Sequence, residues 1–230
     1  MKVEIWSDVV CPFCYVGKRK FEAALAGFAH RAEVEVIWRS FELTPDYQPV
    51  PGRSVHASLA EKKGISEVRA RQMSDQMTAI AAEVGLRYDF DRAVPANTFL
   101  VHQFIHLAAA HGLQDAAKER AFAAYYTEGQ NLGNLETLVA LGREIGLDAE
   151  EIRATLTVGT YADAVRHDEY QARQIGVGGV PFFVFDDKYA VSGAQPTDVF
   201  AEVLTTVWAE QQPALAGDEA AACGLESGIC

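Results

Sequence analysis

The chain of 230 residues is 49% hydrophobic and can bury a full core, either as one domain or as one domain that carries a large insertion. Its formal net charge of −12 argues against nucleic acid and anionic membranes as partners, because either would require a basic surface. The sequence also contains no run of about 18 apolar residues that could span a bilayer.

Residues 1–48 predict a strand, a helix and a second strand. The apolar run at residues 3–10 is typical of a buried strand, residues 15–29 have helical spacing, and residues 33–38 alternate as a half-buried strand does. A strand–helix–strand unit is most simply closed as a right-handed parallel crossover. We therefore expect the first half of an α/β fold in this segment.

Two cysteines lie at the junction of the first strand and the first helix, in the sequence Cys11-Pro12-Phe13-Cys14. Cys11 falls near the N-cap, Pro12 suits the first helical position, and Cys14 lies one turn into the helix. The partial positive charge of the helix end favours a thiolate at Cys11, whereas Cys14 is expected to be covered and to keep a higher pKa. This arrangement predicts a dithiol/disulfide redox centre in which Cys14 resolves mixed disulfides by attacking Cys11.

Asp8 stands three residues before Cys11, near the end of the predicted strand. One interpretation is a partly buried acid whose pKa is raised by burial and which handles the proton of Cys14. The other is an acid that caps or faces the N-terminus of the following helix. The residues alone leave both interpretations open.

The pattern changes at residues 47–52, where two prolines and a glycine interrupt regular structure. From there to residue 175, apolar residues recur almost entirely at helical spacing, which predicts an all-helical domain inserted into the α/β scaffold. The individual helical segments are expected at residues 67–84, 98–111, 114–128, 135–145, 149–156 and 161–174.

Metal binding is not favoured by the pattern of histidines and cysteines. His102 and His106 are four residues apart on a predicted helix, but the glutamate of the metalloprotease pattern is missing, so packed or solvated helix histidines are expected. A structural zinc at Cys11 and Cys14 would need two more ligands close by, and none is evident. We therefore predict no metal and no cofactor.

The scaffold resumes after the insertion. Residues 176–179 are rich in glycine but precede a Val-Pro and a strand, so a backbone turn is favoured over a dinucleotide-binding loop. Residues 182–185 and 189–192 predict a β-hairpin, and a last helix is expected from near residue 196 to about residue 212. Residues 213–230 predict a flexible tail, because they are small and acidic.

Cys223 and Cys230 lie on this tail, separated by six residues. A disulfide that closes so short a loop would contribute only about 2.5 kcal/mol in the chain-entropy model, and only where a folded element benefits. Our hypothesis is that they form a second redox pair that exchanges electrons with Cys11 and Cys14. The alternatives are unpaired exposed thiols, an incidental disulfide, or a zinc site that uses both pairs.

Taken in order, these elements resemble the thioredoxin fold of the DsbA family. Residues 7–17, together with 179–184 and 189–196, resemble more narrowly the FrnE-type cytoplasmic branch of that family. The resemblance covers residues 1–212. It implies an α/β thioredoxin fold with a large all-helical insertion between the βαβ half and the ββα half. The expected division is a thioredoxin-like domain at 1–48 and 176–212, an inserted domain at 49–175, and a tail at 213–230.

The resemblance also assigns roles to residues. It implies that Cys11 attacks, that Cys14 resolves, and that Pro181 is a cis-proline beside the dithiol. Val180 would offer backbone groups to an extended substrate, with Pro12 and Phe13 as further substrate contacts. The dipeptide between the cysteines lacks the histidine of the strongly oxidising members, so a milder reduction potential is expected.

The predicted function is a thiol–disulfide oxidoreductase, or a disulfide isomerase, that acts on protein or peptide thiols. The expected recycling partner is glutathione or a thioredoxin-type protein. No signal peptide precedes the first strand, so we expect a cytoplasmic protein, in which cysteines serve redox chemistry more often than structural disulfides.

Two other functions remain open. One is a chaperone-like binding protein with an incidental dithiol. The other is a glutathione-dependent small-molecule isomerase like the hydroxychromene-carboxylate isomerases, which share this architecture but carry a serine where Cys11 stands.

Overall fold

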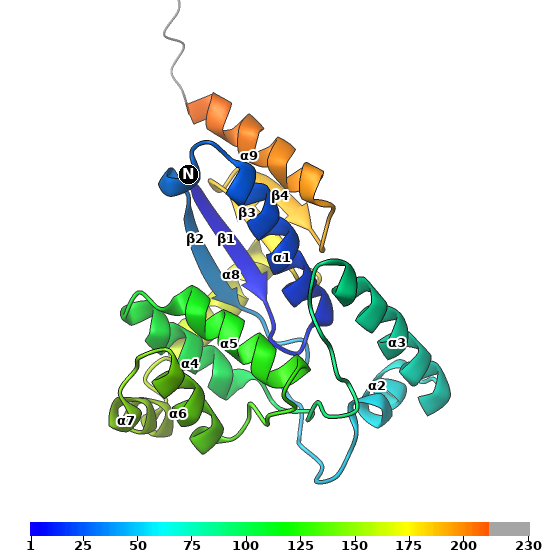
Figure 1. Ribbon diagram of the computed structural model, residues 1–230. Helices are drawn as coiled ribbons and strands as arrows, with labels where there is room; N and C mark the ends of the chain where they lie inside the picture. The colour runs from blue at the N-terminus through cyan, green and yellow to red at the C-terminus, as the bar shows by residue number, and fades with distance from the viewer. Residues whose placement is uncertain (212–230) are drawn as a thin grey trace, which may run out of the picture.

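The computed structural model describes residues 1–211, so Cys223 and Cys230 lie outside the described part of the chain. Its four strands form one mixed sheet (Figure 1). Most of the helices come between the second and third strands in the chain. The strands are β1 (Lys2–Ser7), β2 (Glu35–Ser40), β3 (Phe182–Phe185) and β4 (Tyr189–Ser192). The helices are α1 (Pro12–Gly27), the short 3₁₀ helix η1 (Arg31–Glu33), α2 (Val55–Lys63), α3 (Glu67–Glu83), α4 (Phe99–Ala110), α5 (Gln114–Tyr126), α6 (Leu135–Glu144), α7 (Ala149–Val158), α8 (Ala162–Gln174) and α9 (Thr197–Gln211).

The sheet has the strand order β2-β1-β3-β4. β1 pairs with β2 in parallel and with β3 in antiparallel orientation, and β3 pairs with β4 as the predicted hairpin. β1 is therefore a central strand, and its apolar run lies between Trp38 of β2 and Phe183 of β3, both of which are in register with Ile5. A strand that is covered on both faces needs such a continuous apolar run.

Helices cover both faces of the sheet. On one face Val3 and Ile5 of β1 pack with Phe21 of α1 and Phe200 of α9, and Figure 1 shows these two helices side by side. On the other face Trp6 packs against α8. Because side chains of a strand alternate between the two faces, successive residues of β1 serve two different cores.

The insertion is built around α4, which packs against α5, α6, α7 and α8. A helix with neighbours on most sides must be apolar nearly all round, and α4 buries Val101, Phe104, Ile105 and Leu107. α6 and α7 approach closely at Gly142, where an added Cβ would lie 2.3 Å from Cδ1 of Ile152.

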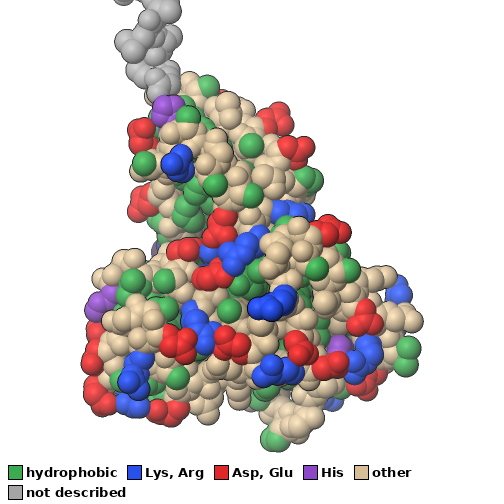
Figure 2. Space-filling view, in the orientation of Figure 1, with side chains coloured by type: hydrophobic (Ala, Val, Ile, Leu, Met, Phe, Trp, Pro, Cys, Tyr) green, Lys and Arg blue, Asp and Glu red, His purple; other side chains and the backbone are tan. Residues whose placement is uncertain are grey.

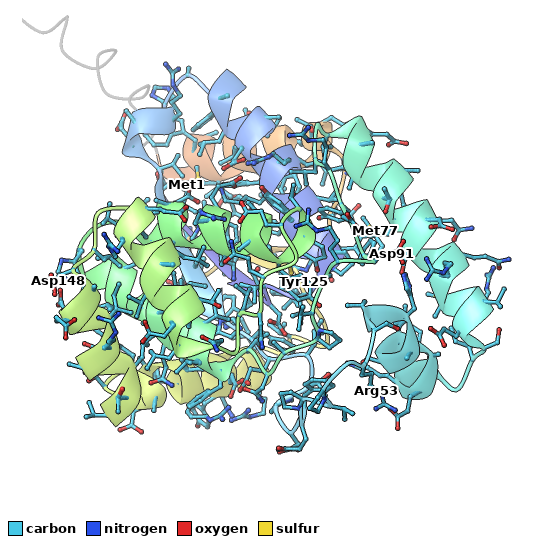
Figure 3. The ribbon with its side chains drawn as sticks, turned by 60° about the horizontal axis from the view of Figure 1, so that its bottom comes forward. Met1, Arg53, Met77, Asp91, Tyr125 and Asp148 are labelled. Atoms are coloured by element: carbon cyan, nitrogen blue, oxygen red, sulfur yellow. The ribbon has the colours of Figure 1, made fainter. Side chains whose placement is uncertain are left out.

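The pair α2 and α3 lies to one side of α4–α7 (Figure 3). Asp91, which follows α3 in the chain, contacts this helix through an ion pair of 2.6 Å between its Oδ1 and Nη1 of Arg71. The sequence pattern predicted no separate segment for α2. Its N-cap Ser54 accepts a hydrogen bond from the Ala57 N–H, and Gly64 ends the helix in the left-handed conformation.

The first helix joins the two cores. Cys11, Cys14 and Tyr15 pack within the core of the helical insertion, whereas Phe21 and Ala24, further along α1, pack within the core of the sheet. The dithiol therefore lies at the junction between the sheet and the insertion, where Figure 1 places the N-terminal end of α1. In the described part of the chain, no helix is both long and apolar enough to cross a membrane.

Candidate active site

Both cysteines are fixed at the N-terminus of α1. β1 ends at Ser7, three residues earlier than the apolar run suggests, because Asp8 to Val10 form a turn in which the Cys11 N–H donates to the Asp8 carbonyl at 3.1 Å. Cys11 is the N-cap residue and Pro12 opens the helix. Both cysteines are free thiols in this structure. The placement is the one predicted from the sequence.

The two thiols differ in access to solvent. Cys11 keeps 5% of its surface exposed and Cys14 keeps none, while Phe13 between them is 48% exposed. Burial raises the pKa of Cys14 well above its usual value, and the neighbouring Cys11 raises it further. The pKa of Cys14 therefore lies above its usual value, in the direction that the sequence predicted, and Cys11 keeps the larger exposed fraction of the two thiols.

The loop before β3 lies against the dithiol. Its Val180–Pro181 peptide bond is cis, and Sγ of Cys11 donates to the Val180 carbonyl oxygen at 3.3 Å. α1 approaches the same loop at Gly17, where an added Cβ would lie 2.9 Å from Cγ of Pro181. The glycine lets the helix and the loop come close enough for Val180 to contact Cys11.

A tyrosine from the insertion also contacts the first turn of α1, between the two cysteines. The hydroxyl of Tyr88 donates to the Pro12 carbonyl at 2.8 Å, and its ring stacks on Tyr126 at 4.3 Å between centroids. Tyr15, directly after the second cysteine, stacks on Phe122 at 4.7 Å. Tyr88 is far from the cysteines in sequence and carries no motif, so the sequence analysis missed it.

Asp8 is fully buried, but its pKa is not raised as the sequence analysis expected. Burial pushes the pKa up, but the nearby His102, the Leu43 N–H and the Lys118 ammonium together outweigh that effect, so the pKa is lowered. His102 Nε2 lies 3.4 Å from Oδ1 of Asp8, and the Leu43 N–H donates to Oδ2 at 2.8 Å. The prediction of an acid with a raised pKa is therefore wrong in direction.

The two histidines of α4 are packed, His102 buried and His106 half-buried, and both are paired with acids. His102 faces Asp8, and Nε2 of His106 lies 2.9 Å from Oδ2 of Asp168 on α8. Packed helix histidines were one of the two expected outcomes. Within residues 1–211, no group of three His, Cys, Asp or Glu side chains is placed to hold a metal ion.

Lys118 of α5 is the second residue that the sequence analysis missed. Its side chain is only 1% exposed, and Nζ donates to the Ser7 carbonyl at 3.2 Å. Burial lowers the pKa of Lys118 to about 8, although the nearby Cys14, Asp8 and Cys11 oppose this shift. The sequence held only a weak signal, namely that Lys118 stands three and four residues before Ala121 and Phe122, which are buried with it on α5.

Comparison with known proteins agrees with this geometry. Residues 2–205 match the family described as the DSBA-like thioredoxin domain. This chain belongs to that family. Its fold is the DsbA-like thiol–disulfide oxidoreductase fold, an α/β thioredoxin fold with a helical insertion.

Three family relatives and neighbours illustrate the similarity. A probable DsbA oxidoreductase from Streptomyces coelicolor, SCO1869, is 45% identical, with a TM-score of 0.87 over 97% of this chain and 96% of that chain. YwbO of Bacillus subtilis, an uncharacterized protein, is 31% identical over 88% of this chain and 95% of its own length. The cytosolic disulfide reductase DsbM from Pseudomonas aeruginosa is 22% identical, with a TM-score of 0.60 over 91% of this chain and 100% of that chain, and shares the fold.

Proposed function

We propose that this protein exchanges disulfides with protein or peptide thiols through Cys11 and Cys14. The observation that supports the proposal best is the contact of Cys11 with the Val180 carbonyl, at a helix N-terminus and in front of a fully buried second thiol. A helix N-terminus favours the thiolate that nucleophilic attack requires, and a buried second thiol competes poorly for outside substrates. Family membership supports the same chemistry in its general form.

The exchange runs in either direction without a cofactor. In oxidation, a substrate thiolate attacks Cys11 of the Cys11–Cys14 disulfide, Cys14 leaves as a thiolate, and a second substrate thiolate then displaces Cys11. In reduction, the Cys11 thiolate attacks a substrate disulfide, and Cys14 then attacks Cys11 and releases the second substrate thiol. Two electrons pass between the dithiol and the substrate in each case.

The surface next to Cys11 supports an extended, partly apolar substrate. Phe13 and Leu43 are 48% and 36% exposed, and the Leu43 N–H donates to Asp8, three residues before Cys11. Acidic and basic side chains are interspersed over the face that Figure 2 shows. We infer that apolar contact near Phe13 and the backbone of Val180 select the substrate, rather than a field of one sign.

We propose glutathione or a thioredoxin-type protein as the recycling partner, and the cytoplasm as the compartment, as in the FrnE-type branch. DsbM, which shares the fold, is described as cytosolic and has also been solved with glutathione. That likeness, at 22% identity, supports the proposal through the fold alone.

Reduction of insulin disulfides by the protein, with glutathione as the electron source, tests the function. We expect Cys11→Ser to lower the rate about 100-fold or more, because the attacking sulfur is lost. Cys14→Ser should accumulate a mixed disulfide with the substrate that mass spectrometry detects.

Insulin reduction by the Cys11→Ser variant at the wild-type rate would refute the proposal. If that variant still suppresses insulin aggregation while reduction is lost, a chaperone-like activity exists beside the enzymatic one. Isomerisation of a chromene carboxylate by wild-type protein with glutathione would instead support the small-molecule alternative.

A further inference from the structure

The resolving step demands an anion in the interior of the protein. Cys14 has no exposed surface and belongs to the apolar core of the insertion. To attack the mixed disulfide it must become a thiolate, and water cannot solvate the thiolate there. A buried anion persists only where hydrogen-bond donors or a cation replace the water.

Ser7 supplies a hydroxyl donor beside Cys14. Its side chain is fully buried, and its Oγ has no hydrogen-bond partner among residues 1–211 while both cysteines are thiols. The Ser7 side chain neighbours Cys14 and favours the ionised form of that thiol. A buried hydroxyl that has no partner in one state and gains one in another stabilises the second state selectively.

Lys118 supplies a buried cation. The comparison is Lys18 of α1, which is also 1% exposed but lies within ion-pair distance of Glu22, Asp115 and Glu119. In the described part of the chain Lys118 has no carboxylate at such a distance, and its Nζ makes one hydrogen bond, to the Ser7 carbonyl. The rings of Trp38 and Phe122 lie 5.5 and 5.2 Å from Nζ.

We propose that the Ser7 hydroxyl and the Lys118 ammonium together form a buried site that holds the Cys14 thiolate during the resolving step. This site rests on the function proposed above, because it serves the second step of that function, the attack of Cys14 on the mixed disulfide. α5 of the insertion provides the cation and the end of β1 provides the hydroxyl, so the site exists only because the insertion packs on the sheet.

The resolving step is balanced without an added reactant. Cys14 gives up its proton and its sulfur bonds to Sγ of Cys11, while the bond between Cys11 and the substrate sulfur breaks. The released substrate sulfur takes up a proton in place of the one that Cys14 lost. Ser7 donates a hydrogen bond to the Cys14 sulfur once that sulfur is ionised, and Lys118 stays protonated.

Other charged groups surround this site and remain in place in the test. Asp8 carries a carboxylate charge that acts on Lys118, and its partner His102 comes from α4. The titratable groups that face Lys118 are Cys11, Cys14, Asp8, His102 and Lys18.

Stopped-flow reaction of the reduced protein with dithiobis-nitrobenzoate separates the two steps. Attack by Cys11 releases the first coloured thiolate, and attack by Cys14 on the mixed disulfide releases the second. We expect Ser7→Ala to slow the second phase about tenfold at pH 7 and to move its pH midpoint up by about one unit, with the first phase unchanged. Lys118→Met should slow the second phase at least as much, and more than it slows the first.

Ser40→Ala is the matched control. Ser40 faces Ser7 in register on β2, is 2% exposed, and bonds to His106 rather than to the dithiol region. Its second phase should match the wild type. Ser7→Ala removes an unpartnered atom and is expected to fold normally, so it remains informative even if Lys118→Met is unstable.

The outcomes separate the two proposals. An unchanged second phase in Ser7→Ala and Lys118→Met, or an equal slowing in Ser40→Ala, would overturn the thiolate site while leaving the function intact. Absence of the first phase in the wild-type protein would overturn the proposed function itself.

Discussion

Asp8 keeps its charge in the interior because its partners replace the water that burial removes. The Leu43 N–H and His102 contact its two oxygens, and the Lys118 ammonium adds a favourable field. The pKa of Asp8 is therefore lowered, even though burial alone would raise it. An ionised carboxylate at neutral pH accepts hydrogen bonds and orders the turn before Cys11, and it holds no proton to give to Cys14.

Substitution of Asp8 tests this account through stability. We expect Asp8→Ala to lower the free energy of unfolding by roughly 2–4 kcal/mol at pH 7, and Asp8→Asn by about half as much, because Asn still accepts from Leu43. A carboxyl whose folded pKa is depressed stabilises the fold above its unfolded pKa and loses that effect as pH falls through the folded pKa. The difference between wild type and Asp8→Asn should therefore shrink below about pH 4.

Urea unfolding at several pH values measures this difference, with the exposed Asp46→Asn as the control. A stability difference for Asp8→Asn that stays constant down to pH 3 would contradict an ionised Asp8.

At the scale of elements, α1 packs into two different cores along its length. Its first turn sits in the core of the insertion and carries the dithiol, while its later turns pack on the sheet with α9. Gly17 lies where α1 meets the loop that carries Pro181, so the spacing between helix and loop depends on the missing side chain. That spacing determines whether Val180 reaches Cys11.

Gly17→Ala and Gly27→Ala form a matched pair on this helix. Helix propensity favours alanine at both positions, but an added Cβ at Gly17 would lie 2.9 Å from Pro181, whereas Gly27 has no atom within 4 Å of an added Cβ. We expect Gly17→Ala to be destabilised by about 1–3 kcal/mol and to reduce insulin several-fold more slowly. Gly27→Ala should keep full activity with equal or slightly greater stability. Equal activity in the two variants would show that the loop tolerates a displaced helix.

On the scale of the whole molecule, the insertion completes the redox centre. Tyr88, His102 and Lys118 all come from the insertion and converge on the turn between β1 and α1. α8, although part of the inserted segment, covers the second face of the sheet and binds it through Asp168, whose Oδ2 accepts from the Ser40 N–H at 2.8 Å. The insertion and the sheet therefore share contacts at the site rather than meeting only through linkers.

The pair Cys223 and Cys230 lies outside the described residues, and its role as a redox relay is still a prediction from the sequence. If the pair passes electrons to Cys11 and Cys14, replacing both tail cysteines by serine should slow turnover with a protein substrate several-fold and shift the glutathione redox titration of the protein. Single-turnover attack by Cys11 on dithiobis-nitrobenzoate should not change. Identical turnover and identical titration curves would remove the relay.

The sequence by itself determined the strand–CxxC–helix junction, the hairpin after Val180–Pro181 and the helical character of the insertion. These features depend on local periodicity, on capping and on short motifs, which neighbouring residues in the chain carry together. The apolar pattern predicted an end of β1 that lies three residues too late. Val9 and Val10 are apolar because they pack against the insertion from within a turn, and they do not continue the strand.

Only the tertiary structure decided the electrostatics of the site. The sign of the pKa shift at Asp8 depends on His102 and Lys118, and the surroundings of Cys14 depend on Ser7 and Lys118, which lie on elements far apart in the chain. The energy of a buried charge is set by the groups that surround it in space, whatever their separation in sequence. Chain packing therefore decides how the two thiols behave, although local sequence decides where they stand.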